Sequence, residues 1–137
     1  MSTFNEAITL TNVGDVSAAE RNLIPQSAIR AITVDACVDT GSWFLVINEE
    51  VRAALGLKTV GLKEATLANG AKVEYPLTEP VNFRWKDREM AMNALLLPDA
   101  EVVLFGALCV KALDLIADPV DECLKGRHGA EAVYQLY

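Results

Sequence analysis

Hydrophobic and polar residues alternate with a period of two in three stretches of this chain. Residues 8–11, 81–85 and 90–93 place larger apolar side chains at every second position. Because neighbouring side chains of a β-strand point to opposite faces, the alternation predicts strands of an antiparallel sheet. The polar "KDRE" at Lys86–Glu89 predicts a short connection that folds the second strand against the third as a hairpin.

A second hairpin is predicted by "EATLANGAKVEY" at residues 64–75. Asn69 and Gly70 are the pair that best accepts the positive φ angles of a tight two-residue turn, and strand-forming residues flank them. We therefore expect a two-stranded arm whose tip is formed by Ala68, Asn69, Gly70 and Ala71.

Helical patterning is limited to two segments. "NEEVRAALGL" offers Asn48 as the N-cap, acidic residues in the first turn and Gly56 as the stop. "ALCVKALDL" from Ala107 to Leu115 has apolar residues at helical spacing. Residues 1–30 give only a strand-like segment and a polar connection to the apolar run Ala31–Val38. The chain is thus expected to be mostly β with two short helices.

Length and composition favour a single domain over residues 1–137. The chain is 52% hydrophobic, which suffices for a core of its own, and it shows no repeat or linker. We place the core at about 32–119, with an N-terminal strand segment at 1–31 and a tail at 120–137. The final "GAEAVYQLY" is apolar enough to pack, and a strand joining a partner's sheet is one possibility.

The net charge and the cysteine content indicate which classes of partner and which cellular compartment to expect. A net charge of −7 argues against nucleic acid and against an anionic membrane surface, so protein or peptide partners are expected. The longest apolar run, Val102–Val110, is too short to span a bilayer, and the N-terminus lacks a secretory pattern. Three widely spaced cysteines suit reduced thiols in a cytoplasmic protein, and no Cys or His spacing predicts a metal or cofactor.

Candidate chemistry lies in "VDTGSW" at residues 38–43, where polar residues separate two apolar stretches. Asp39, Thr40, Gly41 and Ser42 all favour turns, so a plain turn is one interpretation. The other is an active-site loop. A carboxylate between two buried segments is partly desolvated. The hydroxyls of Thr40 and Ser42 can hold it, and Gly41 lets backbone amides come close. The local pattern leaves both interpretations open.

The order of motifs along the chain resembles that of the retropepsin-like aspartic proteases. "VDTGSW" is similar to their Asp-Thr-Gly-Ser signature, the Asn-Gly hairpin stands where they have a flap, and "VVLFGALCVKALDL" resembles their hydrophobic-hydrophobic-Gly segment and C-terminal helix. The similarity covers about Ile32–Pro119 and is greatest to small bacterial members. Two departures are Ala107, where viral members have Arg, and a hairpin tip with Gly70 as its one glycine.

The resemblance implies a closed or partly open β-barrel of the acid protease type, acting as an aspartic endopeptidase on peptides or proteins. In this family two aspartates share one proton and hold a water between them. Because Asp-Thr-Gly occurs once here, the resemblance implies a homodimer that brings two Asp39 residues together. Thr40 would bond across the two-fold axis, Gly41 and Ser42 would orient the carboxylate, and the arm tip would close over the substrate.

The remaining expectations concern specificity and rival functions. Apolar subsites are expected from Trp43, Leu67, Leu104 and Phe105, with plain core packing as the alternative for each. A retropepsin-like dimer that binds peptides or mediates assembly without cleavage is the alternative function. A sugar-kinase phosphate loop would need a longer chain, and a nucleophile built from Cys37 or Cys109 with His128 competes with thiols packed in the core.

Overall fold

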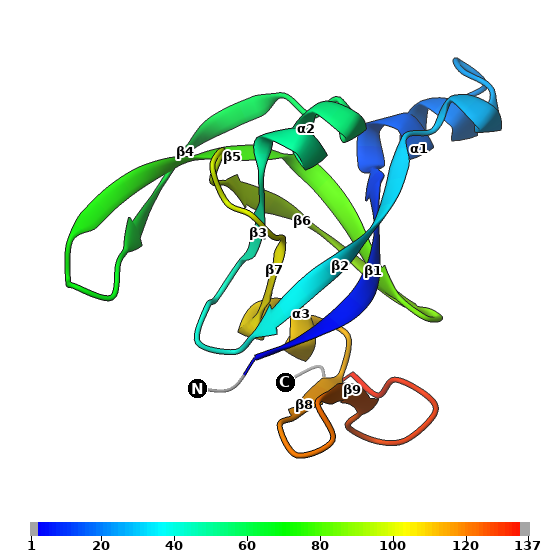
Figure 1. The fold of residues 1–137 in the computed structure, drawn as a ribbon. Coiled ribbons are helices and arrows are strands. Elements are labelled where there is room, and N and C mark those ends of the chain that lie inside the picture. The colour runs from blue at the N-terminus through cyan, green and yellow to red at the C-terminus, as the bar shows by residue number, and fades with distance from the viewer. Residues whose placement is uncertain (1–2, 135–137) are drawn as a thin grey trace.

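The computed structural model describes residues 3–134, which form a closed barrel of six strands with a projecting arm (Figure 1). Around the barrel the order is β1-β2-β7-β3-β6-β5, and pairing of β1 with β5 closes it. The barrel strands are β1 (Phe4–Asn12), β2 (Ala31–Asp39), β3 (Leu45–Ile47), β5 (Lys72–Trp85), β6 (Arg88–Leu96) and β7 (Leu104–Gly106). This confirms the expected mostly-β barrel.

Two of the strand pairs differ from the expected antiparallel sheet. β7 lies between β2 and β3 and runs parallel to β2, and β3 runs parallel to β6. Alternation along one strand indicates which face is buried, but it carries no information on the direction of a partner that comes from elsewhere in the chain. The direction of these strands is therefore a property of the closed barrel.

β5 is a single strand of 14 residues that serves both the arm and the barrel. Its first half pairs with β4 (Thr59–Thr66) and its second half with β6 and β1. The β5–β6 connection is shorter than the predicted "KDRE", because Trp85 pairs directly with Arg88. Only Lys86 and Asp87 form the turn, and Lys86 adopts a φ of 54° there.

The helix predicted after Asn48 is present as α2 (Glu49–Leu55). The Asn48 side chain accepts a hydrogen bond from the Val51 amide at 3.0 Å, and Gly56 ends the helix with a φ of 63°. α3 (Ala107–Ala112) is shorter than predicted: Asp114 turns the chain with a φ of 53°, and β8 (Leu115–Asp118) begins immediately after it.

Residues 3–30 contain two helical elements that the sequence pattern did not predict, namely α1 (Val13–Glu20) and the 3₁₀ turn η1 (Gln26–Ala28). The Asn12 side chain caps α1 by accepting a hydrogen bond from the Asp15 amide at 3.0 Å. Asn12 also donates to the Leu55 carbonyl at 2.7 Å, which ties α1 to α2. Figure 1 shows α1 standing out from one end of the barrel.

The core fills the barrel and extends to the helices that close it. Its largest fully buried side chains include Ile8, Leu10, Leu45, Phe83 and Phe105. The rings of Phe83 and Phe105 meet edge to face, with centroids 5.6 Å apart and an interplanar angle of 82°. This packing gives the ends of β2 and β7 a rigid support.

A C-terminal hairpin of β8 and β9 (Cys123–Gly126) packs below the barrel (Figure 1). The buried Arg88 guanidinium holds it by donating to the carbonyls of Leu113 at 3.0 Å, Asp114 at 2.7 Å and Gly129 at 2.6 Å. Residues 129–134 form no strand, and the rest of the predicted terminal strand lies outside the described residues.

None of the helices within residues 3–134 combines the length and hydrophobicity that crossing a membrane requires.

Candidate active site

Asp39 is the last residue of β2, between two neighbours in the sheet. Its backbone pairs with Gly106 of β7, and the strand before it pairs with β1. Val38 before it and Leu45 after the loop are 1% and 0% exposed, so buried side chains anchor both ends of the loop. The Asp39 residue itself is half-buried.

Backbone hydrogen bonds within the loop fix the Asp39 carboxylate. The Gly41 amide donates to Asp39 Oδ1 at 3.0 Å, and the Ser42 amide donates to the Asp39 carbonyl at 3.0 Å. The loop is thus a tight turn, and it also holds a carboxylate. The two interpretations left open by the sequence are compatible, because the turn is what positions the acid.

The far side of the loop is bonded to the start of α3. The amides of Ala107 and Leu108 donate to the carbonyls of Ser42 and Trp43 at 2.7 and 3.0 Å. These bonds satisfy amides at the helix N-terminus that have no partner inside the helix. Two of the three motifs that carried the family resemblance, 67 residues apart from Asp39 to Gly106, are therefore in direct contact.

Gly106 permits this contact, and its role was not anticipated beyond its place in "VVLFG". A Cβ at Gly106 would lie 2.5 Å from the Phe44 carbonyl oxygen and 2.6 Å from that of Trp43. Real Cβ atoms do not approach backbone oxygens so closely, so only glycine fits. The glycine after an apolar strand was the signal available in the sequence.

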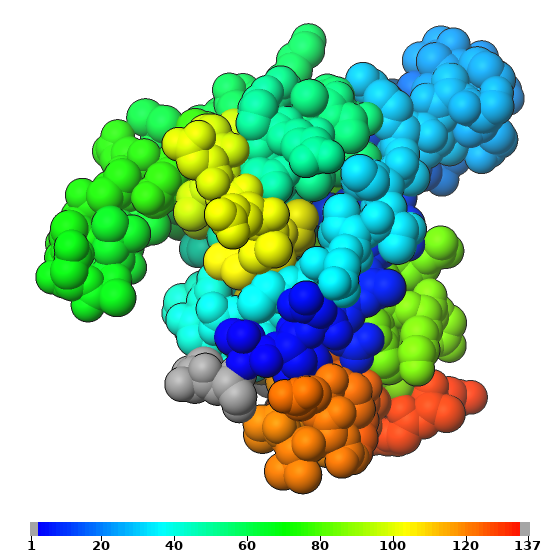
Figure 2. Space-filling model, in the orientation of Figure 1, coloured from blue at the N-terminus to red at the C-terminus, as the bar shows by residue number. Residues whose placement is uncertain are grey.

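The arm is formed by β4 and the first half of β5, and it projects beyond the body of the molecule (Figure 2). Its tip lies at Ala68–Ala71, as predicted, and these residues are exposed. The turn type differs from the prediction: the Gly70 amide donates to the Leu67 carbonyl at 2.9 Å, and the Leu67 amide to the Ala71 carbonyl at 2.8 Å.

These bonds define a loop of three residues instead of two. Gly70 has a φ of 86°, while Asn69 is not among the residues with positive φ. Asn69 instead accepts a hydrogen bond from the Ala71 amide on its side-chain oxygen, at 2.9 Å. A three-residue hairpin needs one left-handed residue, and Gly70 supplies it.

The four residues expected to form apolar subsites differ in their exposure to solvent. Trp43 is 65% exposed and Leu67 is 39% exposed, so both present surface, and Leu104 is half-buried. Phe105 is 0% exposed and packs against Phe83, so its expected role as a subsite is wrong. On β7 alternate residues face opposite sides, and Phe105 faces the barrel interior.

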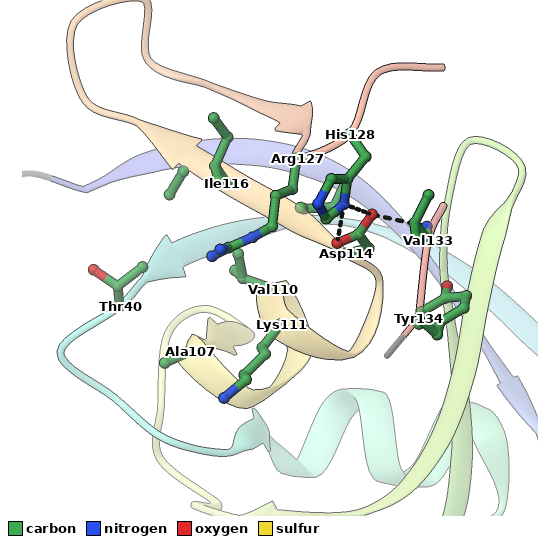
Figure 3. Close-up of a pocket in the computed structure, with 12 residues that line it drawn as sticks. Thr40, Ala107, Val110, Lys111, Asp114, Ile116, Arg127, His128, Val133 and Tyr134 are labelled. Atoms are coloured by element: carbon green, nitrogen blue, oxygen red, sulfur yellow. Dashed lines mark hydrogen bonds and ion pairs between the residues drawn. The ribbon is translucent and has the colours of Figure 1, made fainter. Parts of the chain in front are cut away.

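A groove of about 790 Å³ runs between α3 and the β8–β9 hairpin, with Thr40 on its lining (Figure 3). Figure 3 shows the Arg127 side chain extending over Val110 on the side of the groove where Thr40 lies. Lys111 and His128 also line the groove. Thr40, itself exposed, thus stands where the Asp39 loop meets a partly cationic surface.

The carboxylate of Asp114, which lines this groove, forms hydrogen bonds with the C-terminal segment. It accepts a hydrogen bond from His128 Nδ1 at 2.8 Å and from the Val133 amide at 2.9 Å. The His128 contact is the main cause that lowers the pKa of Asp114, followed by the Val133 amide, with desolvation acting in the opposite direction. Asp114 therefore anchors the C-terminal segment.

A cysteine nucleophile finds no support in this arrangement. Cys109 is 0% exposed, and burial raises the pKa of its thiol to about 12, so it carries almost no thiolate at neutral pH. His128 is paired with Asp114 and approaches no cysteine within hydrogen-bond distance among the described residues. No group of three or more potential metal-ligating side chains is found within residues 3–134.

Comparison with known proteins agrees with this geometry. The family model for aspartyl proteases matches residues 26–108, which is more than half of the chain. No curated protein matches the sequence significantly. The fold is similar to the crystal structure of the retroviral protease-like domain of Ddi1 from Leishmania major, with a TM-score of 0.51 and 14% sequence identity.

The structural similarity covers 91% of this chain and 84% of the Leishmania domain, so it extends over nearly the whole fold. The matched family segment contains Asp39, the arm and Gly106, and the structure pairs Asp39 directly with Gly106. The chain therefore belongs to the aspartyl protease family and has the retropepsin-like fold.

Proposed function

We propose that this protein is an aspartic endopeptidase whose active site forms when two copies of the chain meet. The observation that carries the proposal is the Asp39 loop: one carboxylate per chain, held by the Gly41 amide and fixed from behind by α3. Hydrolysis of an amide needs an acid and a base at the same time. A second Asp39 on a two-fold axis supplies the missing group.

The chemistry follows from two carboxyl groups that share one proton. Like charges this close cannot both ionise, so one group stays protonated while the other is a carboxylate. The carboxylate takes a proton from a water held between them, and the water oxygen attacks the peptide carbonyl carbon while the protonated partner donates to the carbonyl oxygen. Proton transfer to the nitrogen then allows the C–N bond to break. No metal or cofactor is required.

The exposed residues of the loop favour a two-fold contact at this position. Thr40 and Gly41 are both exposed, whereas the residues that anchor the loop are buried. In a homodimer Thr40 would bond across the axis, and the arms with their tips at Ala68–Ala71 would cover a peptide bound over the paired Asp39 side chains. Trp43, Leu67 and Leu104 would contact apolar side chains of that peptide.

The test is cleavage of a peptide library by the purified protein at pH values from 3 to 8. Asp39→Asn should abolish cleavage while leaving the sedimentation coefficient of the dimer unchanged. Asp35→Asn is the matched control, because Asp35 is exposed on the same strand and accepts a hydrogen bond only from the Asn5 side chain at 3.1 Å among the described contacts. A protein that sediments as a monomer at high concentration would contradict the proposed site.

The same experiment addresses the second candidate function, a dimer that binds peptides or mediates assembly without cleaving. The dimer contact alone could account for an ordered Asp39 loop. If the dimer forms and retains peptides but cleaves none of them at any pH in that range, the binding module replaces the enzyme.

We also propose a cytoplasmic location. Cys37, Cys109 and Cys123 are all free thiols in the structure, as expected for a reducing compartment.

A further inference from the structure

The arm has two chemically different faces. In an antiparallel pair, residues directly opposite each other point to the same side. One side, here called the inner face, carries the pairs Gly61/Leu77, Lys63/Tyr75 and Ala65/Val73, and the outer face carries Leu62/Pro76, Glu64/Glu74 and Thr66/Lys72.

Burial distinguishes the two faces as well. Four of the six inner-face residues, namely Ala65, Val73, Tyr75 and Leu77, are half-buried. On the outer face Leu62 is 65% exposed, and all the remaining residues except Pro76 are exposed too. The inner face is therefore the one turned toward the body of the molecule.

Lys63 is the one charged residue among the six of the inner face. Its Nζ lies 5.9 Å from the centroid of the Phe44 ring. Phe44 follows Trp43, whose carbonyl is bonded to α3 as part of the Asp39 loop. The inner face of the arm thus places a single cation beside the loop that carries the proposed catalytic carboxylate.

We infer that Lys63 selects acidic side chains in the peptide that binds between the arm and the Asp39 loop. The inference rests on the proposed peptide-binding site, which the enzyme and the binding module share. Lys63 is exposed, and the other five residues of the inner face carry no charge, so an apolar peptide with one Asp or Glu at the matching position meets complementary groups. A carboxylate offers the ammonium a charge-assisted hydrogen bond in place of the longer contact with Phe44.

Two-fold symmetry adds a second requirement. A homodimer has two arms and two Lys63 residues, so the preference for acidic side chains should occur at two positions, one on each side of the paired Asp39 residues. The substrate class is therefore an extended apolar peptide with acidic residues flanking its centre.

The experiment measures binding separately from cleavage. The Asp39→Asn protein is incubated with a random decapeptide library, and the retained peptides are identified by mass spectrometry. Asp and Glu should be enriched about two- to fivefold at the preferred positions, the range expected for a solvent-accessible ion pair. Adding Lys63→Glu should reverse the preference toward Lys and Arg, and Lys63→Arg should preserve it.

Lys72→Glu in the same background is the matched control. Lys72 belongs to the same arm but to its outer face, where its Nζ lies 3.6 Å from Glu64 Oε1. Lys72→Glu changes the net charge of the protein by the same amount as Lys63→Glu. An equal loss of acidic enrichment in Lys63→Glu and Lys72→Glu, or no enrichment in the parent, overturns the inference.

The proposed proteolysis and the proposed role of Lys63 in specificity can be refuted independently of each other. Cleavage by the wild type without regard to acidic residues leaves the enzyme proposal standing and refutes the role of Lys63. Retention of acidic peptides that depends on Lys63, without any cleavage, supports the role of Lys63 and refutes the enzyme.

Discussion

Single residues decide whether the Asp39 loop can be built. Asp39, Thr40 and Ser42 supply polar atoms, but the loop keeps its place because Gly106 lacks a side chain. The carbonyls of Trp43 and Phe44 occupy the space that a Cβ at Gly106 would need. The geometry of the site therefore depends on a residue that takes no part in the chemistry.

Gly106→Ala should lower the free energy of unfolding by roughly 1–3 kcal/mol, the usual cost of forcing extra volume into a packed site. The loop must move away, which weakens the bonds from the Ala107 and Leu108 amides. Urea denaturation followed by circular dichroism measures the change. Gly61→Ala is the control, because a Cβ at Gly61 meets no atom within 4 Å. Equal effects of the two substitutions would contradict this account.

Residue-level expectations held where one local interaction decides the outcome. Asn48 caps α2 and Gly56 ends it, since both interactions lie within one helical turn. The position of the turn at Asn69 and Gly70 was predicted correctly, but its type was not, since the loop has three residues and not two. The pairing of the strands beyond the turn sets the number of loop residues. Phe105 was offered as a subsite although barrel closure buries it completely.

At the scale of elements, the β8–β9 hairpin depends on a few polar contacts with the barrel. Arg88 from β6 binds three carbonyls around the hairpin, and Glu6 from β1 accepts a hydrogen bond from the Leu124 amide at 2.7 Å. Asp114 joins α3 to the segment after β9 through His128 and Val133. These contacts position the groove beside Thr40.

The Asp114 contacts predict acid sensitivity of this region. The pKa of Asp114 in the folded protein lies below the value of 3.8 that is usual for aspartate, mainly because of His128. The stabilisation is therefore complete above pH 3.8 and is lost as the pH falls through the lower, folded-state pKa. At pH 6 the urea midpoint of Asp114→Asn should be lower than that of the wild type. The two midpoints should converge as the pH is lowered toward 2.

Asp87→Asn is the control for that experiment, because it removes the same charge from the exposed β5–β6 turn. Asp15, Glu49 and Asp118 also have lowered pKa values in the folded state, so both variants should still lose stability in acid. Midpoints for Asp114→Asn that run parallel to the wild type over the whole range would refute the role of Asp114.

Element boundaries were predictable only where the signal was local. α1 begins with Asn12 as a cap and Asp15 in the first turn, a recognisable start signal. Its helical face shows little segregation of apolar residues, so periodicity gave no indication of the helix. α3 ends early because Asp114 turns the chain into β8, and that turn is favoured by hydrogen bonds to His128, Val133 and Arg88.

At the scale of the whole molecule, one chain provides half of the proposed catalytic pair. Asp39 is paired with Gly106 in the barrel, and the arm projects beyond the body (Figure 2). The exposed Thr40 marks the surface where a second copy is expected. Activity should therefore depend on the state of both chains in a dimer.

Mixing wild type with Asp39→Asn tests this dependence. After equal amounts have exchanged subunits, about one quarter of the dimers contain two intact Asp39 residues. Activity should fall to about one quarter of an all-wild-type sample at the same total concentration. A fall to only about one half would mean that each chain acts alone. The activity of the same mixture, measured before the subunits have exchanged completely, provides the internal reference.

On β6 the predicted alternation does not match the observed burial, since Met90 is 41% exposed. The sequence by itself determined the buried faces of β1 and of the second half of β5, the cap and end of α2, the place of the arm and the identity of the Asp-Thr-Gly-Ser loop. These features depend on residues close together in the chain, where side-chain chemistry and backbone preference act directly. The tertiary structure decided the parallel pairing of β2 with β7, the contact of Gly106 with the Asp39 loop, the burial of Phe105 and the inward face of Lys63. Each joins residues distant in sequence, and only closure of the barrel brings them together.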